Sequence, residues 1–99
     1  MTEFSVKTTL PDEIDREEAR DVLDQALQRE AKLAAAKYAY FQRRCQAFEA
    51  TFDMDSDAFM QQFESGALGD DAEYFDWYAA KRGRDLWARR ASILAGAQM

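Results

Sequence analysis

The sequence predicts an all-α protein made of a long helix, a short helix and a long antiparallel helix, with a short N-terminal extended arm. An apolar seam follows the first half of the chain with alternating spacings of 4 and 3, which is typical of a helix that packs along another helix. Turn signals interrupt the chain at 53–56 and 65–70. Beyond them, apolar residues again recur at helical spacing, which predicts the returning helix.

The first 14 residues form the predicted arm, and residues 15–99 form the predicted helical domain. Over 3–10, Phe4, Val6, Thr8 and Leu10 alternate with polar residues, which is typical of a short strand, and Pro11 ends it. A strand that ends in Leu-Pro before a helix also occurs in ribbon–helix–helix repressors. Those proteins need a turn soon afterwards, whereas residues 15–52 contain no break, so direct nucleic-acid binding is disfavoured.

The first helix is expected to begin after a cap at Asp12 or Asp15 and to run to Phe52, a length of about 55 Å. One face of it carries the association seam, which consists of Leu27, Ala31, Ala34, Tyr38, Phe41, Cys45, Phe48 and Phe52. A returning helix of about 27 residues cannot cover one of about 38, so seam should remain exposed at one end. Exposed apolar surface is a common mark of an interface, and we therefore expect a homodimer.

The second and third helices follow from capping residues. Asp55 or Ser56 can cap a short helix that ends at Glu64, and Gly66 is a natural C-terminal cap. The last helix opens at 70–71 and runs to about residue 95. Its apolar residues form a first stripe of Ala72, Phe75, Ala79, Leu86 and Ile93 and a second stripe of Trp77, Ala80, Trp87, Ala91 and Leu94. Two stripes predict a helix that is covered on more than one side.

Gly83 lies in the middle of this last helix, where glycine costs about 1 kcal/mol relative to alanine. A close crossing of two backbones would explain its presence. The Ala-rich turns of the long helix are the expected partner for that crossing.

Composition limits the class of protein. Ninety-nine residues make one domain, and a net charge of −6 argues against nucleic acid as the main ligand. The chain has no apolar run long enough for a membrane span and no signal-peptide core near its start. A single cysteine fits a reducing compartment. We therefore expect a cytoplasmic protein that does not enter a membrane.

No arrangement of side chains indicates catalysis or a cofactor. Histidine is absent, and Cys45 lies inside the apolar seam with no base to activate it. Four acidic residues match the ligand positions of a calcium-binding EF-hand loop: Asp53, Asp55, Asp57 and Glu64. The obligatory glycine of that loop is replaced by Ala58, and the segment is better explained as a capped helix. We expect no enzyme activity, cofactor or metal.

Charge is segregated along the second half of the chain. Residues 53–76 hold eight acidic side chains and no Lys or Arg, whereas 81–90 hold five basic side chains and one acidic one. A solvated loop followed by a helix with a basic end would explain this pattern. The alternative is an acidic surface that binds a basic partner. Its candidate contacts are Asp70, Asp71 and Asp76, with Phe75 and Trp77 as apolar anchors. Core packing is the alternative for both aromatic residues.

Three stretches of sequence resemble one family: Phe-Glu-Ala-Thr-Phe-Asp-Met at 48–54, Gly-Ala-Leu-Gly-Asp-Asp at 66–71 and Tyr-Phe-Asp-Trp at 74–77. The opening Lys-Thr-Thr-Leu-Pro at 7–11 is similar as well. The chain resembles small helical prokaryotic antitoxin-like proteins, which are encoded beside a toxin. The resemblance implies a protein partner and no catalytic residues.

Two functions remain after these observations. In the first, the chain neutralises a co-encoded, basic toxin through its helical and acidic surfaces. In the second, it is a self-associating helical scaffold or dimerisation protein with no inhibitory target.

Overall fold

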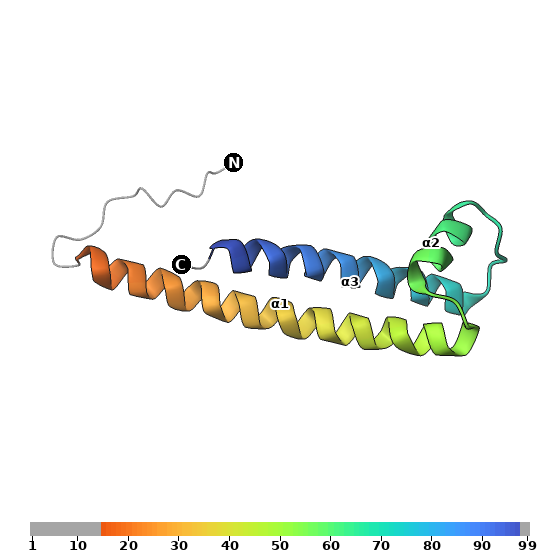
Figure 1. The fold of residues 1–99 in the computed structure, drawn as a ribbon, viewed down its shortest axis with the longest axis horizontal. Coiled ribbons are helices and arrows are strands. Elements are labelled where there is room, and N and C mark those ends of the chain that lie inside the picture. Colours follow the sequence, from red (N-terminus) through yellow and green to blue (C-terminus); the bar gives the residue numbers. More distant parts are fainter. Residues whose placement is uncertain (1–14, 98–99) are drawn as a thin grey trace.

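Helix α1, Arg16–Phe52, runs without interruption along the whole length of the molecule (Figure 1). The computed structural model describes residues 15–97, so the predicted arm at 3–10 lies outside the described residues. Asp15 caps α1 by accepting a hydrogen bond from the Glu18 backbone N–H at 2.7 Å. The helix ends at Asp53, whose φ of 53° is left-handed and stops further helical growth.

Helix α2, Ser56–Glu64, is short and capped at both ends. The Asp55 carboxylate accepts from the Ala58 backbone N–H at 2.7 Å. At the other end, Gly66 has a φ of 80°, and the N–H of the following Ala67 reaches the carbonyl of Gln62 at 3.0 Å. The predicted roles of Asp55 and Gly66 as caps are therefore confirmed.

Helix α3, Ala72–Ala97, returns antiparallel along α1, with α2 beside it at the hairpin end (Figure 1). All regular secondary structure in residues 15–97 is helical, so the predicted order of a long, a short and a long helix is confirmed. Phe41 faces Gly83 and Phe48 faces Trp77. Continued to its end, this register leaves the N-terminal end of α1 without α3 beside it, as Figure 1 shows.

The hairpin is long and thin. Its principal extents are 62 × 28 × 19 Å, and its radius of gyration is 19.6 Å. A globular domain of 100 residues would have a radius of gyration of about 13 Å. A two-helix layer of this shape has little interior, and the buried apolar side chains among the described residues are Ala34, Cys45, Phe59, Trp77 and Ala80.

The association seam is the face of α1 that packs within the molecule. Every seam residue is buried or partly covered, and Ala34 and Cys45 are fully buried. What remains open on α1 includes Val22 and Leu23, at the end that extends beyond α3. The predicted seam therefore serves intramolecular packing over most of its length.

The expectation that α3 is covered on more than one side holds only near its start, where both α1 and α2 pack on it. The second stripe faces α1, and Trp77 and Ala80 of that stripe are fully buried. The first stripe lies on the opposite face of α3, where Phe75, Leu86 and Ile93 are largely exposed. Phe75 of this stripe meets Phe63 of the short helix α2, and beyond α2 the apolar residues of the outer face stay open.

Gly83 marks the closest approach of α3 to α1. A Cβ atom at this position would lie 2.8 Å from Cδ1 and Cε1 of Phe41. The close crossing is therefore real, but the expected contact with the Ala-rich turns of α1 is wrong. The flat ring of Phe41 occupies the space that a side chain at position 83 would need.

Candidate functional site

An aromatic cluster joins the three helices at the hairpin end. Trp77 is fully buried in its centre, stacked on Phe59 with ring centroids 4.0 Å apart and an interplanar angle of 6°. Phe48 and Phe52 of α1 also stack on it, with ring centroids 5.7 and 5.5 Å away and interplanar angles of 13° and 16°. Of the two interpretations of Trp77, the structure supports core packing, because a fully buried ring offers no surface to a partner.

A single hydrogen bond satisfies the polar atom in this cluster. The Trp77 indole N–H donates to the Ser56 hydroxyl at 2.9 Å, and both residues are buried. Ser56 is itself held by Glu49, whose carboxylate accepts from the Ser56 backbone N–H at 2.9 Å. Through these contacts the first residue of α2 is fixed to both long helices, and the acidic segment that follows starts from a rigid base.

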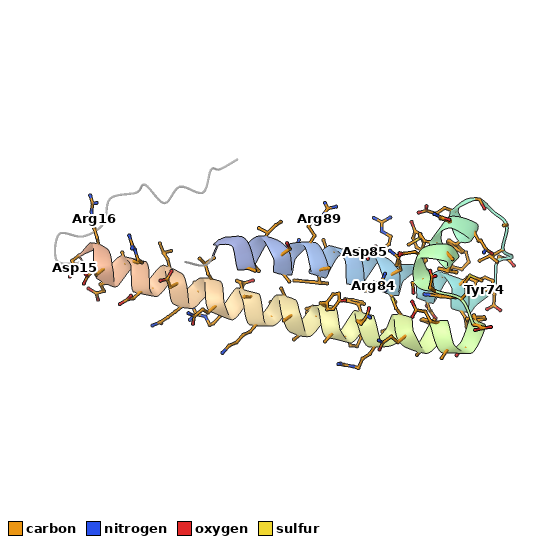
Figure 2. All side chains as sticks on the ribbon, in the orientation of Figure 1. Asp15, Arg16, Tyr74, Arg84, Asp85 and Arg89 are labelled. Atoms are coloured by element: carbon orange, nitrogen blue, oxygen red, sulfur yellow. The ribbon has the colours of Figure 1, made fainter. Side chains whose placement is uncertain are left out.

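Phe75 differs from Trp77 in that more than half of it is exposed. Its ring meets Phe63 of α2 edge-to-face, with centroids 5.3 Å apart. One side of the Phe75 ring therefore packs on α2, and the other side is open to solvent. An aromatic residue placed in this way can contact another protein. Tyr74, on the preceding position, lies at the hairpin end and packs on Phe52 and Phe59 (Figure 2).

The eight acidic residues of 53–76 differ in what they do within the fold, and Asp71 both caps a helix and is exposed to solvent. Four have structural positions: Asp53 closes α1, Asp55 caps α2, Asp57 forms a salt bridge and Asp71 caps α3 by accepting from the Glu73 N–H at 2.9 Å. Within residues 15–97, salt bridges involve only Asp57 and Asp85 among the carboxylates. Asp70, Asp71 and Asp76 are exposed and have no cation beside them in that range. Their negative charge is directed to solvent at the hairpin end.

A buried lysine ties α2 to α3. The Lys81 ammonium lies 3.1 Å from the Asp57 carboxylate and also pairs with Asp85 one turn along α3. Arg84 reaches the same two carboxylates and donates to Gln42 of α1 at 3.4 Å. Figure 2 shows Arg84 and Asp85 on α3 next to α2. Sequence reasoning missed this network, although the spacing of Lys81 and Asp85 is that of a helical ion pair.

The network shifts the pKa of two of its members. Burial by itself lowers the pKa of Lys81, but the hydrogen bonds to Asp85 and Asp57 outweigh it, so the pKa lies above its ordinary 10.5. The hydrogen bond from Lys81 holds the pKa of Asp57 below its ordinary 3.8. The stability that Lys81 contributes is therefore lost only as pH rises through its raised folded pKa. The contribution of Asp57 is lost as pH falls through its lowered one.

We expect Asp57→Asn to lower the urea midpoint at neutral pH, because Lys81 then loses one of its two anionic partners. The difference from wild type should shrink as the pH falls below about 3.8. Asp57 of the wild-type protein is then protonated first in the unfolded state and, at lower pH, in the folded state as well. Urea unfolding followed by circular dichroism between about pH 2 and pH 7 measures it. A difference that stays constant over this range would contradict the proposed pairing.

Cys45 and the EF-hand-like carboxylates show no shared site. Burial raises the pKa of the Cys45 thiol, which opposes formation of the reactive thiolate. Asp53, Asp55 and Asp57 are scattered by the start of α2, as expected for a capped helix. Among the described residues, no three His, Cys, Asp or Glu side chains gather closely enough to hold a metal ion. None of the three helices combines the length and apolarity that crossing a membrane requires.

An open groove of about 370 Å³ lies between α2 and α3, on the side of Lys81 that faces solvent. Its apolar lining comes from Met60 and Leu86, and its cations from Lys81, Arg82 and Arg89. Arg89 projects from the side of α3 away from α1 (Figure 2). The surface of α3 thus changes from acidic near Asp76 to basic near Arg89.

Comparison of the chain with protein-family models, curated proteins and solved structures gives no match. The antitoxin-like resemblance therefore rests on the residues quoted above. The geometry by itself describes a helical hairpin with an acidic, partly aromatic end and an open apolar face.

Proposed function

We propose that this chain is a cytoplasmic, antitoxin-like protein that binds and neutralises a co-encoded basic toxin. The observation that carries the proposal is the group of exposed carboxylates Asp70, Asp71 and Asp76, which form no salt bridge within residues 15–97 and lie close in sequence to the exposed Phe75. A carboxylate that is paired within the fold would have to give up a hydrogen bond or a salt bridge to bind a partner. Of these three, only Asp71 has such a bond among the described residues, the one that caps α3.

The physical basis is complementarity of charge around an apolar anchor. Toxins of this kind that act on RNA carry a basic cleft, and an acidic surface can occupy it in place of the substrate. Phe75 supplies contact area that fixes the orientation, while Trp77 and Phe59 keep the backbone beneath it rigid. No residue of this chain needs to perform chemistry in such a role.

Co-expression tests the proposal. The product of the neighbouring gene should arrest growth when expressed alone and should be harmless when this chain is present. Asp70→Lys combined with Asp71→Lys should weaken the rescue, with Glu17→Lys combined with Glu18→Lys on the distant end of α1 as the control. A neighbour that is harmless alone, or equally toxic with this chain present, would reject the antitoxin function.

Self-association is the second candidate function. It is favoured by the exposed apolar residues of α3 and by the open end of α1, since isolated two-helix hairpins have little core to stabilise them. We expect a homodimer under either function.

A further inference from the structure

The outer face of α3 carries a regular stripe that α1 does not cover and that α2 contacts at Phe75. From Ala72 to Ile93 its positions recur with spacings of 3 and 4 over three heptads. The apolar members Phe75, Leu86 and Ile93 are 54%, 46% and 63% exposed. The heptad positions are the five residues of the first stripe together with two arginines that fill the gaps between them: Ala72, Phe75, Ala79, Arg82, Leu86, Arg89 and Ile93. A heptad pattern on an exposed helix face is the pattern of a helix that packs against another helix.

The two ends of this face carry opposite charge. Acidic residues stand at the start of α3, where Asp76 immediately follows Phe75. Basic residues stand towards its end, where Arg89 and Arg90 precede Ile93. A helix with this distribution repels a parallel copy of itself and attracts an antiparallel one.

We propose that this face of α3 binds the same face of a second copy in an antiparallel, two-fold symmetric pair. With the two-fold axis near position 84, Phe75 of one copy meets Ile93 of the other, and Arg82 lies against Leu86. Arg89 meets Ala79, whose small side chain leaves room for the longer one. On the flank of the stripe, Asp76 of each copy then lies opposite Arg90 of the other.

The other flank is compatible with this arrangement. Asp85 of the two copies would approach one another near the axis, but each Asp85 is already paired with Lys81 and Arg84 of its own chain. α2 packs along this flank, and its groove beside Leu86 and Arg89 remains open to the second helix. The face of α3 that holds Trp77 and Ala80 stays against α1, so pairing requires no change in the hairpin.

This inference rests on the second candidate function, self-association, and names the surface that would perform it. Its test requires no toxin, so failure of the co-expression experiment leaves it standing, and its own failure leaves the antitoxin proposal standing. If both proposals hold, dimerisation and toxin binding compete, because Phe75 and Asp76 belong to both surfaces.

Sedimentation equilibrium of the full chain is the first experiment. We expect a reversible association to twice the 11.4 kDa mass of one chain. Leu86→Arg should weaken the dimer by at least about 100-fold, because it places a second guanidinium against Arg82 of the other copy in both halves of the symmetric pair. Leu33→Arg is the matched control, since Leu33 on α1 is 44% exposed, close to the value for Leu86, and lies outside the stripe.

A charge exchange tests the antiparallel register. Arg90→Glu should weaken the dimer, since it brings two acidic side chains together, and adding Asp76→Arg to the same chain should restore it. Circular dichroism confirms that each variant remains helical. A wild-type monomer at the highest soluble concentration would overturn the proposal. So would a dimer that survives Leu86→Arg but is broken by Leu23→Arg, which would place the interface on α1.

Discussion

Trp77→Ala is expected to destabilise the protein more than any other single truncation in α3, by about 3–5 kcal/mol. The indole is fully buried, stacks on rings from α1 and α2, and supplies the hydrogen bond that holds Ser56. Removing it opens a cavity where all three helices meet and leaves a buried hydroxyl without its donor. Small domains have total stabilities of about 5–15 kcal/mol, so the variant should be partly unfolded at room temperature.

Urea unfolding followed by circular dichroism measures this loss. Trp87→Ala is the control, because Trp87 lies on the same stripe of α3 but is only partly buried, with Arg90 over its ring at 4.9 Å. Its truncation should cost clearly less. Trp77→Phe keeps most of the stacking and should lose about 1–3 kcal/mol, chiefly from the unpaired Ser56 hydroxyl. Equal losses for Trp77→Ala and Trp87→Ala would contradict the central position assigned to Trp77.

Gly83→Ala should also destabilise the hairpin, although alanine is the better helix former. Helix propensity favours the change by about 1 kcal/mol. The opposing effect is a clash with the ring of Phe41, which the new methyl group would approach to 2.8 Å. Overpacking of a fitted contact costs about 1–3 kcal/mol, so we expect a net loss of about 1–2 kcal/mol. Three atoms of the ring, including Cγ, lie within 3 Å of the added carbon, so the whole ring has to shift to make room.

Gly96→Ala is the matched control for this prediction. Gly96 lies in the same helix, and a Cβ atom there would meet nothing within 4 Å. The control should therefore be neutral or slightly stabilising, and thermal unfolding of the two variants should move in opposite directions. A Gly83→Ala variant whose thermal midpoint rises like that of Gly96→Ala would contradict the close contact between Gly83 and Phe41.

The helices could be predicted from the sequence because local chemistry decides where each one ends. Asp55 and Gly66 cap α2 as expected, and the lack of any break over 15–52 correctly predicts one long helix. The seam on α1 could be predicted because its period matches that of a packed helix. The helix that covers the seam could not be predicted, because α3 of the same chain and a helix of a second chain would require the same spacing of apolar residues.

The candidate site was harder to predict because exposure depends on tertiary packing. Both stripes of α3 have helical spacing, and only the fold shows that Trp77 faces α1 while Phe75 faces solvent. The acidic segment could be recognised by composition. Which of its carboxylates are used within the fold could not, because the pairing of Asp57 with Lys81 joins residues on different helices.

The central claim is that the open surface at the hairpin end binds another protein through charge around Phe75. The most direct test is the rate of association between this chain and the purified product of the neighbouring gene, measured as the salt concentration rises. We expect a saturable complex whose association slows as salt rises, and slows further in the variant that combines Asp70→Lys with Asp71→Lys. Absence of any complex, or a complex whose association rate ignores both salt and these two residues, would contradict it.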